Sequence, residues 1–258
     1  MDAARRVHAP PSATVFEAGS AKVPRLTEPG PIHLRPAAEL ADRVLLPGDP
    51  HRALSVAQAI LDAPKMFNHT RGLWGYTGTA PDGRLLTVQA TGMGGPSAAI
   101  VVEELVALGA RTLIRIGTCG ALAPGTDLGE LVVAREVVAA DGTSTALGAE
   151  GRMAANPVLT DALVAAGARD VVAVSTDVFY DGRQGLQAEW MQMGAEVVEM
   201  EAAALLAVAR RRKVDAAVLL GVTDLLDGTR RRIDEEALEA VGIRLGETAY
   251  EAIAASGS

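Results

Sequence analysis

The amino-acid sequence predicts an α/β fold built as one large domain. A length of 258 residues, of which 49% are hydrophobic, is enough for one sizeable core. Only 3% of the residues are aromatic, so that core must consist of Ala, Val, Leu and Ile, which suits helices packed closely on a sheet. Apolar runs of strand length also follow one another along the chain with amphipathic stretches of helical length between them.

The N-terminal residues differ from the rest. Residues 1–30 are rich in Ala, Pro and charged side chains, and we expect a disordered or loosely attached extension there, followed by the folded domain over residues 31–258. No apolar run in the extension is long enough for a signal peptide or a membrane span. Together with a single cysteine, this predicts a cytoplasmic protein without a membrane partner.

The first half of the domain predicts strands that lead into helices. An apolar run over 43–46 predicts a strand, and Pro50 suits the first turn of a helix that ends near Leu61. Turn residues at 81–83 join two alternating segments, 71–78 and 84–90, into a hairpin. The apolar spacing over 98–108 predicts an amphipathic helix.

The second half continues the same pattern around loops. We expect strands over 111–116, 131–138, 171–175, 195–201 and 216–222 and helices over 158–166, 202–212 and 233–255. Residues 141–156 are small and polar, which predicts a mobile loop. The basic run 210–213 follows the helix over 202–212, where it complements the dipole of the helix C-terminus.

The strongest chemical signal lies in the stretch 111–120. Arg115 interrupts an apolar strand, and a charge at such a position needs an anion. Gly117, Thr118 and Gly120 follow, and they predict a tight turn whose N–H groups and hydroxyl converge on one spot. The alternative is a structural ion pair between Arg115 and a buried carboxylate.

A second anion site is indicated after the strand over 43–46. There Gly48 permits close backbone approach, and Arg52 projects near the N-terminus of the following helix. A plain strand-to-helix turn is the alternative. The Gly-rich turn at 91–97 fits neither a G-x-G-x-x-G fingerprint nor a P-loop, which disfavours a nicotinamide cofactor or ATP.

Polar residues also follow other strands. Period-2 alternation places Glu199 and Glu201 on one face at the carboxyl end of a strand, where open α/β sheets bind ligands and where a sugar diol would supply hydrogen bonds. Thr223 and Asp224 end another buried strand. Phe179, with its neighbour Tyr180, could stack on a flat ligand, although core packing explains the pair equally well.

Composition excludes several other classes of function. The formal net charge is −8 and no basic tract is rich in aromatics, so nucleic acid is not an expected partner. The single cysteine, Cys119, excludes a disulfide framework and a cysteine-built metal site, and no metal is expected. No histidine lies near Cys119 in the sequence to activate it, which favours a small buried packing residue over a nucleophile.

In its order of motifs the chain resembles the nucleoside phosphorylases, a family that includes hexameric purine nucleoside phosphorylase, methylthioadenosine phosphorylase and uridine phosphorylase. The resemblance covers residues 32–258 and rests on these segments: 47–50 (PGDP), 71–72 (RG), 92–97 (GMGGPS), 115–120 (RIGTCG), 179–180 (FY), 198–201 (VEME) and 223–224 (TD). It implies a central mixed, twisted β-sheet flanked by helices.

The resemblance also implies a substrate site in three compartments. For phosphate it implies Gly48, Arg52, Arg115 and Thr118, with Arg71 supplied by a neighbouring subunit. For ribose it implies Met93, Met200 and Glu201, with the neighbour's His33 near the 5′ end. For the base it implies Phe179 and Asp224, of which Asp224 is the catalytic acid.

The implied activity is phosphorolysis of purine nucleosides to the free base and ribose 1-phosphate, in nucleoside salvage. No cofactor is implied, since inorganic phosphate is a co-substrate, and the implied assembly is a dimer-based homohexamer. Asp224 favours a purine, because the uridine enzymes lack an acid there, and their Gln and Arg pyrimidine reader has no clear match in 181–186.

Several alternatives stay open. Uridine or 5′-methylthioadenosine phosphorylase is one, and a non-catalytic nucleoside-binding protein of the same fold is another. A nucleosidase, which uses water, is disfavoured because water needs no cluster of guanidinium groups. The spacing of Arg230, Arg231 and Arg232 after Asp224 differs from that of the arginine that assists the acid in some purine enzymes, so that role is not assigned.

Overall fold

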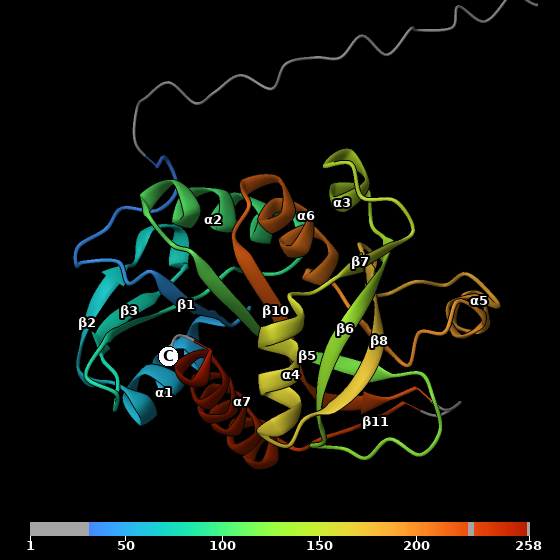
Figure 1. The fold of residues 1–258 in the computed structure, drawn as a ribbon. Helices are drawn as coiled ribbons and strands as arrows, with labels where there is room; N and C mark the ends of the chain where they lie inside the picture. The colour runs from blue at the N-terminus through green and yellow to red at the C-terminus, as the bar shows by residue number, and fades with distance from the viewer. Residues whose placement is uncertain (1–30, 227–229, 257–258) are drawn as a thin grey trace, which may run out of the picture. The chain divides into compact units, whose positions relative to one another are not determined.

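The computed structural model describes residues 31–226 and 230–256. The N-terminal extension expected over residues 1–30 lies outside the described residues. In the described part of the chain, strands of mixed direction join into one eleven-stranded sheet with helices packed against it (Figure 1). The predicted α/β class is therefore confirmed.

Most elements agree with the sequence pattern. The helices are α1 (Pro50–Ile60), α2 (Gly95–Leu108), α3 (Gly142–Ala146), α4 (Pro157–Ala165), α5 (Leu186–Gln192), α6 (Ala202–Arg212) and α7 (Glu235–Ala255), with the short 3-10 helix η1 (Thr70–Gly72). The strands are β1 (Arg43–Leu46), β2 (Asp62–Asn68), β3 (Gly75–Thr79), β4 (Leu85–Gln89), β5 (Thr112–Ala121), β6 (Leu131–Ala140), β7 (Arg152–Ala154), β8 (Arg169–Thr176), β9 (Val197–Glu199), β10 (Asp215–Leu225) and β11 (Arg231–Arg232). Of these, the sequence pattern did not predict α3, α5, β2, β7 or β11.

The prediction of a mobile loop over residues 141–156 is wrong. Asp141 is the N-cap residue of α3 there, and its side chain accepts a hydrogen bond from the backbone N–H of Ser144 at 2.7 Å. Strand β7 then pairs antiparallel with β6. Capping by Asp141 and pairing with an existing sheet edge supply the order that a pattern of small residues does not reveal.

Five strands of the sheet close into a ring. Strand β5 pairs with β10, β10 with β6, β6 with β8, β8 with β9, and β9 returns to β5. From the ring the sheet extends through β1, β4, β3 and β2. Closure brings the ends of β5, β8, β9 and β10 together at one edge.

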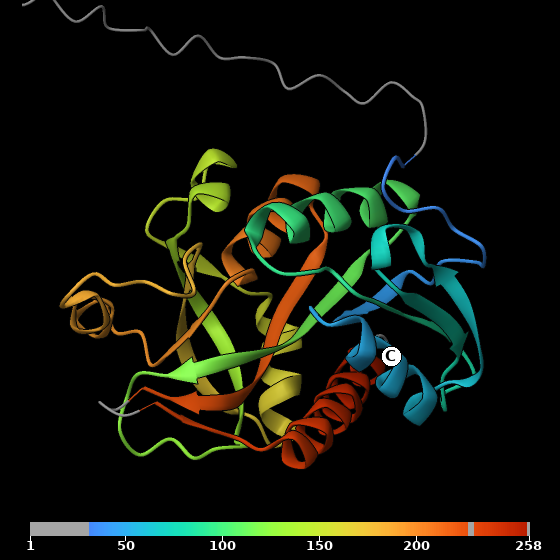
Figure 2. The same ribbon diagram turned by 180° about the vertical axis from the view of Figure 1, so that it is seen from behind.

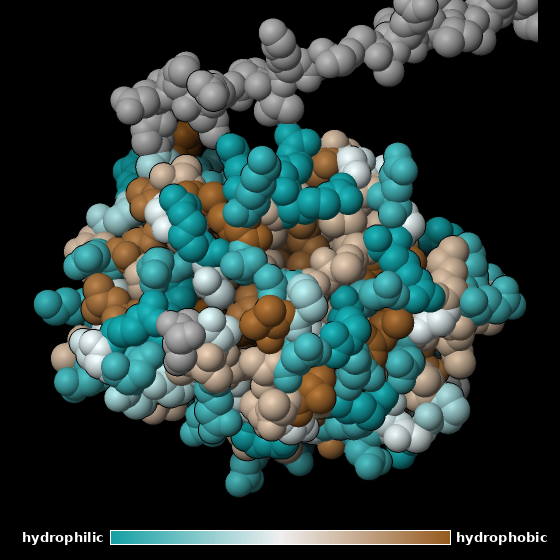
Figure 3. Space-filling model, in the orientation of Figure 1, coloured by the Kyte–Doolittle hydropathy of each residue, from teal (hydrophilic) through white to brown (hydrophobic). Residues whose placement is uncertain are grey.

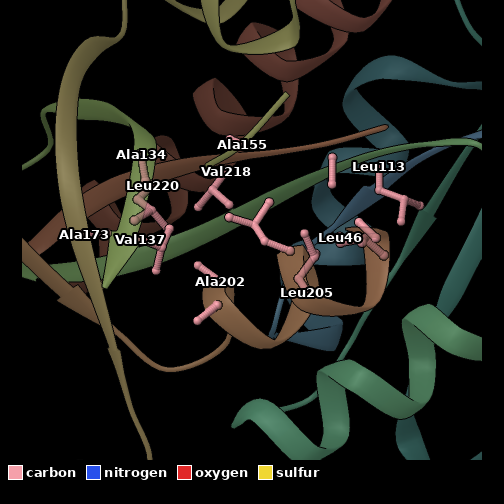
Figure 4. Packing of buried hydrophobic residues seen from close by; sticks show 14 of the residues in the cluster. Leu46, Leu113, Ala134, Val137, Ala155, Ala173, Ala202, Leu205, Val218 and Leu220 are labelled. Atoms are coloured by element: carbon pink, nitrogen blue, oxygen red, sulfur yellow. The ribbon is translucent and has the colours of Figure 1, made fainter. Parts of the chain in front are cut away.

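The helices cover two faces of the sheet. Helices α2 and α6 lie on one face and α1, α4 and α7 on the other, as both ribbon views show (Figures 1 and 2). Each side has its own apolar cluster of mainly Ala, Val, Leu and Ile. In the first cluster Ala202 and Leu205 of α6 lie close to side chains of the central strands (Figure 4).

Small residues permit the close approach of the helices. Residues 202–209 of α6 are all buried, which Ala-rich composition allows between a sheet and a second helix. On the opposite face, a Cβ at Gly246 of α7 would lie 2.5 Å from Val56 Cγ1 of α1. The absence of a side chain at Gly246 therefore sets the distance between α1 and α7.

The surface mixes polar and apolar side chains. On the face seen in Figure 3 polar residues predominate, with apolar ones scattered between them. Across the helices that the structure describes, none is both long and apolar enough to cross a membrane.

We predict that Gly246→Ala lowers the free energy of unfolding. Overpacking of a filled core costs ~1–3 kcal/mol, which exceeds the gain of about 0.8–1.0 kcal/mol from replacing glycine inside a helix. Gly242→Ala, one turn earlier, is the matched control, because a Cβ there would lie 3.4 Å from Arg52 Cγ, an ordinary contact. Urea unfolding should show a loss for Gly246→Ala and none for Gly242→Ala, and equal stability of the two variants would contradict this packing argument.

Candidate functional site

A cleft of about 1120 Å³ opens at the carboxyl ends of the ring strands. Residues from the ends of β5, β8, β9 and β10 line it, together with the segments that follow β1 and β4. Open α/β sheets bind ligands at this edge. The cleft contains these sequence-predicted residues: Gly48, Arg52, Met93, Arg115, Thr118, Phe179, Met200, Glu201 and Asp224.

Strand β5 does not turn after Arg115. It continues to Ala121, and Gly117 and Thr118 pair in register with Leu220 and Gly221 of β10. The predicted tight turn of N–H groups is therefore wrong. Gly117 instead makes room for a side chain, because a Cβ there would lie 2.6 Å from Arg115 Nη2.

Arg115 lies between two carboxylates in the floor of the cleft. Its Nε donates to Glu199 Oε2 at 3.0 Å, and its Nη2 donates to Glu201 Oε2. All three residues are buried. Among the described residues, Arg115 Nη1 is one of two buried side-chain polar atoms without a hydrogen-bond partner. The structural ion pair, which the sequence left open as the alternative to an anion site, is present, and one nitrogen still remains for a further acceptor.

The charges in this group depend on one another. Burial lowers the pKa of Arg115, but Glu201 and Glu199 outweigh that effect, so its pKa is raised overall and it stays charged. Burial raises the pKa of Glu199, and Glu201 adds to the rise, whereas Arg115 opposes it. One guanidinium between two carboxylates leaves one uncompensated negative charge when all three are ionised.

Arg52 supplies a second guanidinium. It is half-buried in the first turn of α1 and lines the cleft, and within the described part of the chain its side chain forms no hydrogen bond or ion pair. Burial lowers the pKa of Arg52, Arg115 lowers it further, and Asp49 and Glu201 raise it. Its side chain also packs on Gly242 of α7. An anion beside Arg115 would offset the cost of holding this charge away from water.

The segments after β1 and β4 lie against each other. The backbone N–H of Gly92 donates to Gly48 O at 3.1 Å. The N–H of Gly94 donates to Glu201 Oε1 at 2.5 Å, so both oxygens of Glu201 are in contact with protein donors. Met93 lies between these two glycines and is 87% exposed at the mouth of the cleft.

Glu201 does not belong to a strand, contrary to the alternation that predicted it. Strand β9 ends at Glu199, and Glu201 is the N-cap residue of α6 with φ −137° and ψ −19°. The two carboxylates nevertheless meet at Arg115. The tight passage from β9 into α6 brings them together.

Asp224, near the end of β10, lines the cleft and has two arginines beside it. Arg230 Nε donates to Asp224 Oδ1 at 2.7 Å, and Arg232 Nε lies 3.1 Å from the same oxygen. The hydroxyl of Thr223 donates to Oδ2 at 2.9 Å. The guanidinium carbon of Arg230 is also 4.7 Å from the ring centroid of Phe179, a cation–π contact.

Two sequence-predicted residues lie elsewhere in the described chain. Arg71, in η1, adopts a left-handed backbone with φ 60°, is exposed, and has no hydrogen-bond or ion-pair partner among the described residues. His33 Nδ1 lies 2.7 Å from Glu104 Oε1 on α2. Neither residue is among those that line the cleft of its own chain.

Sequence reasoning did not assign three of the site's residues. Glu199 was noticed as a partner of Glu201 on one face but received no role, and Arg230 and Arg232 were set aside because of their spacing. The spacing of Arg230 is explained by β11, which pairs antiparallel with the end of β10 and returns the chain to Asp224. In the described residues no group of three or more His, Cys, Asp or Glu is placed to hold a metal ion.

Comparison with known proteins yields one family. The Phosphorylase superfamily matches residues 42–256. A purine nucleoside phosphorylase DeoD-type from Roseobacter denitrificans is 38% identical over 197 residues, which cover 73% of this chain and 84% of the relative. A protein of the same name from Exiguobacterium sibiricum is 34% identical over 215 residues, which cover 79% of this chain and 91% of the relative.

Proposed function

This chain belongs to the nucleoside phosphorylase family of the phosphorylase superfamily, and on that premise we propose that it cleaves purine nucleosides with inorganic phosphate. The products are the free base and ribose 1-phosphate, as expected for nucleoside salvage. One observation carries the proposal: Arg115 and Arg52 line the same cleft, and Arg115 keeps a buried nitrogen without a hydrogen-bond partner among the described residues. In this proposal phosphate is a co-substrate and the chain uses no cofactor.

Phosphate is assigned to the side of the cleft formed by β5 and the start of α1. Arg115 Nη1 and Arg52 supply the positive charge, and Thr118 and the backbone at Gly48 complete the set. Charge-assisted hydrogen bonds to an oxyanion are among the strongest that proteins make. Water as the nucleophile would leave the Arg52 guanidinium without an anion and Arg115 Nη1 without a charged acceptor.

Ribose is assigned to Glu201, with Met200 and Met93 beside it. A carboxylate can accept two hydrogen bonds on each oxygen, so Glu201 can accept from the ribose hydroxyls as well as from Arg115 and Gly94. Its charge also lies where an oxocarbenium-like sugar develops positive charge. The proposed role of Glu201 is to hold the sugar and favour that state.

The base is assigned to Phe179 and Asp224. Phe179 is 53% exposed and so has a free face for stacking. Departure of a purine leaves negative charge on the base, and Asp224 in its acid form would donate a proton to N7. Arg230 is placed to hold the carboxylate that remains.

Three observations favour a purine over a pyrimidine. Asp224 is present at the base side, and the relatives named above are purine nucleoside phosphorylases. The stretch that would have to read a pyrimidine also contains Arg183, whose Nη2 lies 2.5 Å from Asp181 Oδ2. That internal ion pair engages the one arginine of the stretch.

We also propose a dimer-based homohexamer in which each cleft receives Arg71 and His33 from a neighbour. Both residues lie outside the cleft of their own chain. Exposed apolar side chains accompany His33: Ile32 is 66% exposed, and Ile100, one helical turn before the Glu104 that binds His33, is 42% exposed. Such side chains favour a contact with a second copy.

Base release should require phosphate, and Arg52→Met should raise the KM for phosphate by about 10–100-fold, the equivalent of a charge-assisted hydrogen bond of ~1.5–3 kcal/mol. Arg52 makes no ion pair in the described chain and is partly buried, so its replacement by an apolar side chain removes the cost of holding a charge away from water. The melting temperature of the variant should therefore not fall. Arg244→Met, on the exposed side of α7, is the control. Equal rates of base release in phosphate-free buffer would reject the proposed reaction.

Asp224→Asn should lower turnover of an ordinary purine nucleoside by ~10²–10⁴-fold, the usual contribution of a positioned acid. A 7-methylpurine nucleoside already carries the positive charge that protonation supplies, so the variant should retain much more activity on it. The measurement is kcat/KM for both substrates with both proteins. An equal loss on the two substrates would exclude Asp224 as the general acid.

Subunit exchange should restore phosphorolysis at low phosphate concentration between two impaired chains. An Arg71→Ala chain and an Arg52→Met chain, each impaired alone, should form mixed assemblies in which some clefts contain both native arginines. Phosphorolysis by the reassembled mixture, compared with each variant alone, is the readout. A monomeric mass in solution with full turnover would contradict the shared site.

A further inference from the structure

Ser175, the penultimate residue of β8, contacts Glu199 of the site but does not itself line the cleft. Its side chain is fully buried, and its hydroxyl donates to Glu199 Oε1. The Ser175 hydroxyl oxygen in turn accepts a hydrogen bond from the backbone N–H of Ala203 at 2.9 Å. A hydroxyl has one donor and two acceptor positions, so both contacts can exist at once. Ser175 thereby connects β8 to the first turn of α6 and to Glu199.

Glu199 is held from three elements. Its Oε2 accepts from the backbone N–H of Glu201 at 2.8 Å and of Ala202 at 2.9 Å at the start of α6, and from Arg115 Nε at 3.0 Å on β5. Oε1 accepts from Ser175 on β8 and from Ala202 N–H at 3.0 Å. Ser175 is therefore the one side-chain donor to Oε1 among the described residues. The torsion that turns a glutamate carboxylate is intrinsically broad, so its orientation depends on such contacts.

The orientation of Glu199 determines that of the guanidinium. Arg115 is planar, and its Nε contact with Glu199 and its Nη2 contact with Glu201 together fix the plane and leave Nη1 unpartnered. A rotation of the Glu199 carboxylate would release Nε and move Nη1. Phosphate binding to Arg115 therefore requires that Glu199 stay in place.

We propose that Ser175 is a positioning residue of the phosphate site, which acts through Glu199 to aim Arg115 at the phosphate substrate. This inference rests on the proposed function. Neither Ser175 nor Glu199 is assigned to any compartment of the substrate site above. The competing role is structural only, in which Ser175 caps Ala203 N–H at the beginning of α6.

The ionisation of Glu199 supplies a second readout. Burial raises the pKa of Glu199, as does Glu201, whereas Arg115 and the Ser175 hydroxyl lower it. Cys119 on β5 also faces this group, but burial raises the pKa of its thiol, so it stays neutral. Removal of the Ser175 donor raises the pKa of Glu199 further. When the pH is lowered, Glu199 of the variant therefore becomes protonated, and stops holding Arg115, at a higher pH than Glu199 of the wild type.

The chain offers a matched control for this serine. Ser144 is also fully buried, and its hydroxyl donates to the buried carboxylate of Asp141 at the N-terminus of α3. Neither Ser144 nor Asp141 lines the cleft, and Asp141 contacts no guanidinium among the described residues. Ser144→Ala removes the same kind of hydrogen bond without touching Arg115.

Ser175→Ala should raise the KM for phosphate about tenfold, comparable to the lower end of the loss that follows removal of a hydrogen-bond partner behind a metal ligand. The kcat at saturating phosphate should be largely retained. As the pH is lowered, the KM for phosphate should begin to rise at a higher pH in the variant than in the wild type. Ser175→Cys keeps a similar side-chain shape and a weak donor, so its KM for phosphate should lie between those of the wild type and Ser175→Ala. Ser144→Ala should leave the KM for phosphate unchanged, even if it lowers the melting temperature.

A phosphate KM that is unchanged in Ser175→Ala, or that shifts equally in Ser144→Ala, would overturn the positioning role. If Ser175→Ala does not fold, Ser175→Cys carries the same comparison. The rise in melting temperature with inorganic phosphate alone separates this inference from the proposed reaction. A wild-type protein that phosphate stabilises, and Ser175→Ala stabilises less, supports the positioning role even without base release. A wild-type protein that phosphate neither stabilises nor activates would overturn both.

Discussion

The buried guanidinium of Arg115 between Glu199 and Glu201 is the interaction on which the site depends. Three charges are removed from water there, and their mutual attraction offsets that cost only with good geometry and further hydrogen bonds. The chain provides them through backbone N–H groups at the start of α6. The N-terminus of this helix also carries the positive end of its dipole, which favours the two carboxylates.

The closed ring of strands makes this arrangement possible. Strand β9 is only three residues long, yet it joins β8 to β5 and closes the ring. Because Glu199 is its last residue and α6 starts three residues later, a short segment delivers both carboxylates to β5. The Ala-rich α6 then packs between the sheet and α2, and small side chains let its first turn reach the strand ends.

Several groups that line the cleft keep positions without a partner in the described chain. Arg52 has no ion pair in the described chain, Arg115 keeps one unpartnered nitrogen, and Met93 and Phe179 are exposed. A buried ion network that keeps one unpaired donor beside a cleft is held rigidly by the protein and can still bind a ligand. This asymmetry is what a site for an anion and a flat, partly apolar molecule requires.

The α/β class, most helices and strands, and several residues of the site could be predicted from the amino-acid sequence, because apolar periodicity and charges inside apolar runs are local signals. Arg115, Glu201 and Asp224 were recognisable for that reason. The continuation of β5 through Gly117 became evident only from the fold, since a glycine-rich stretch predicts a turn until a neighbouring strand pairs with it. The fold alone placed Arg230 on Asp224, because the return of the chain through β11 is a non-local contact. The connection of Ser175 to Arg115 through Glu199 is also visible only in the fold, because a hydrogen bond between β8 and a carboxylate 24 residues away leaves no periodic pattern in the sequence.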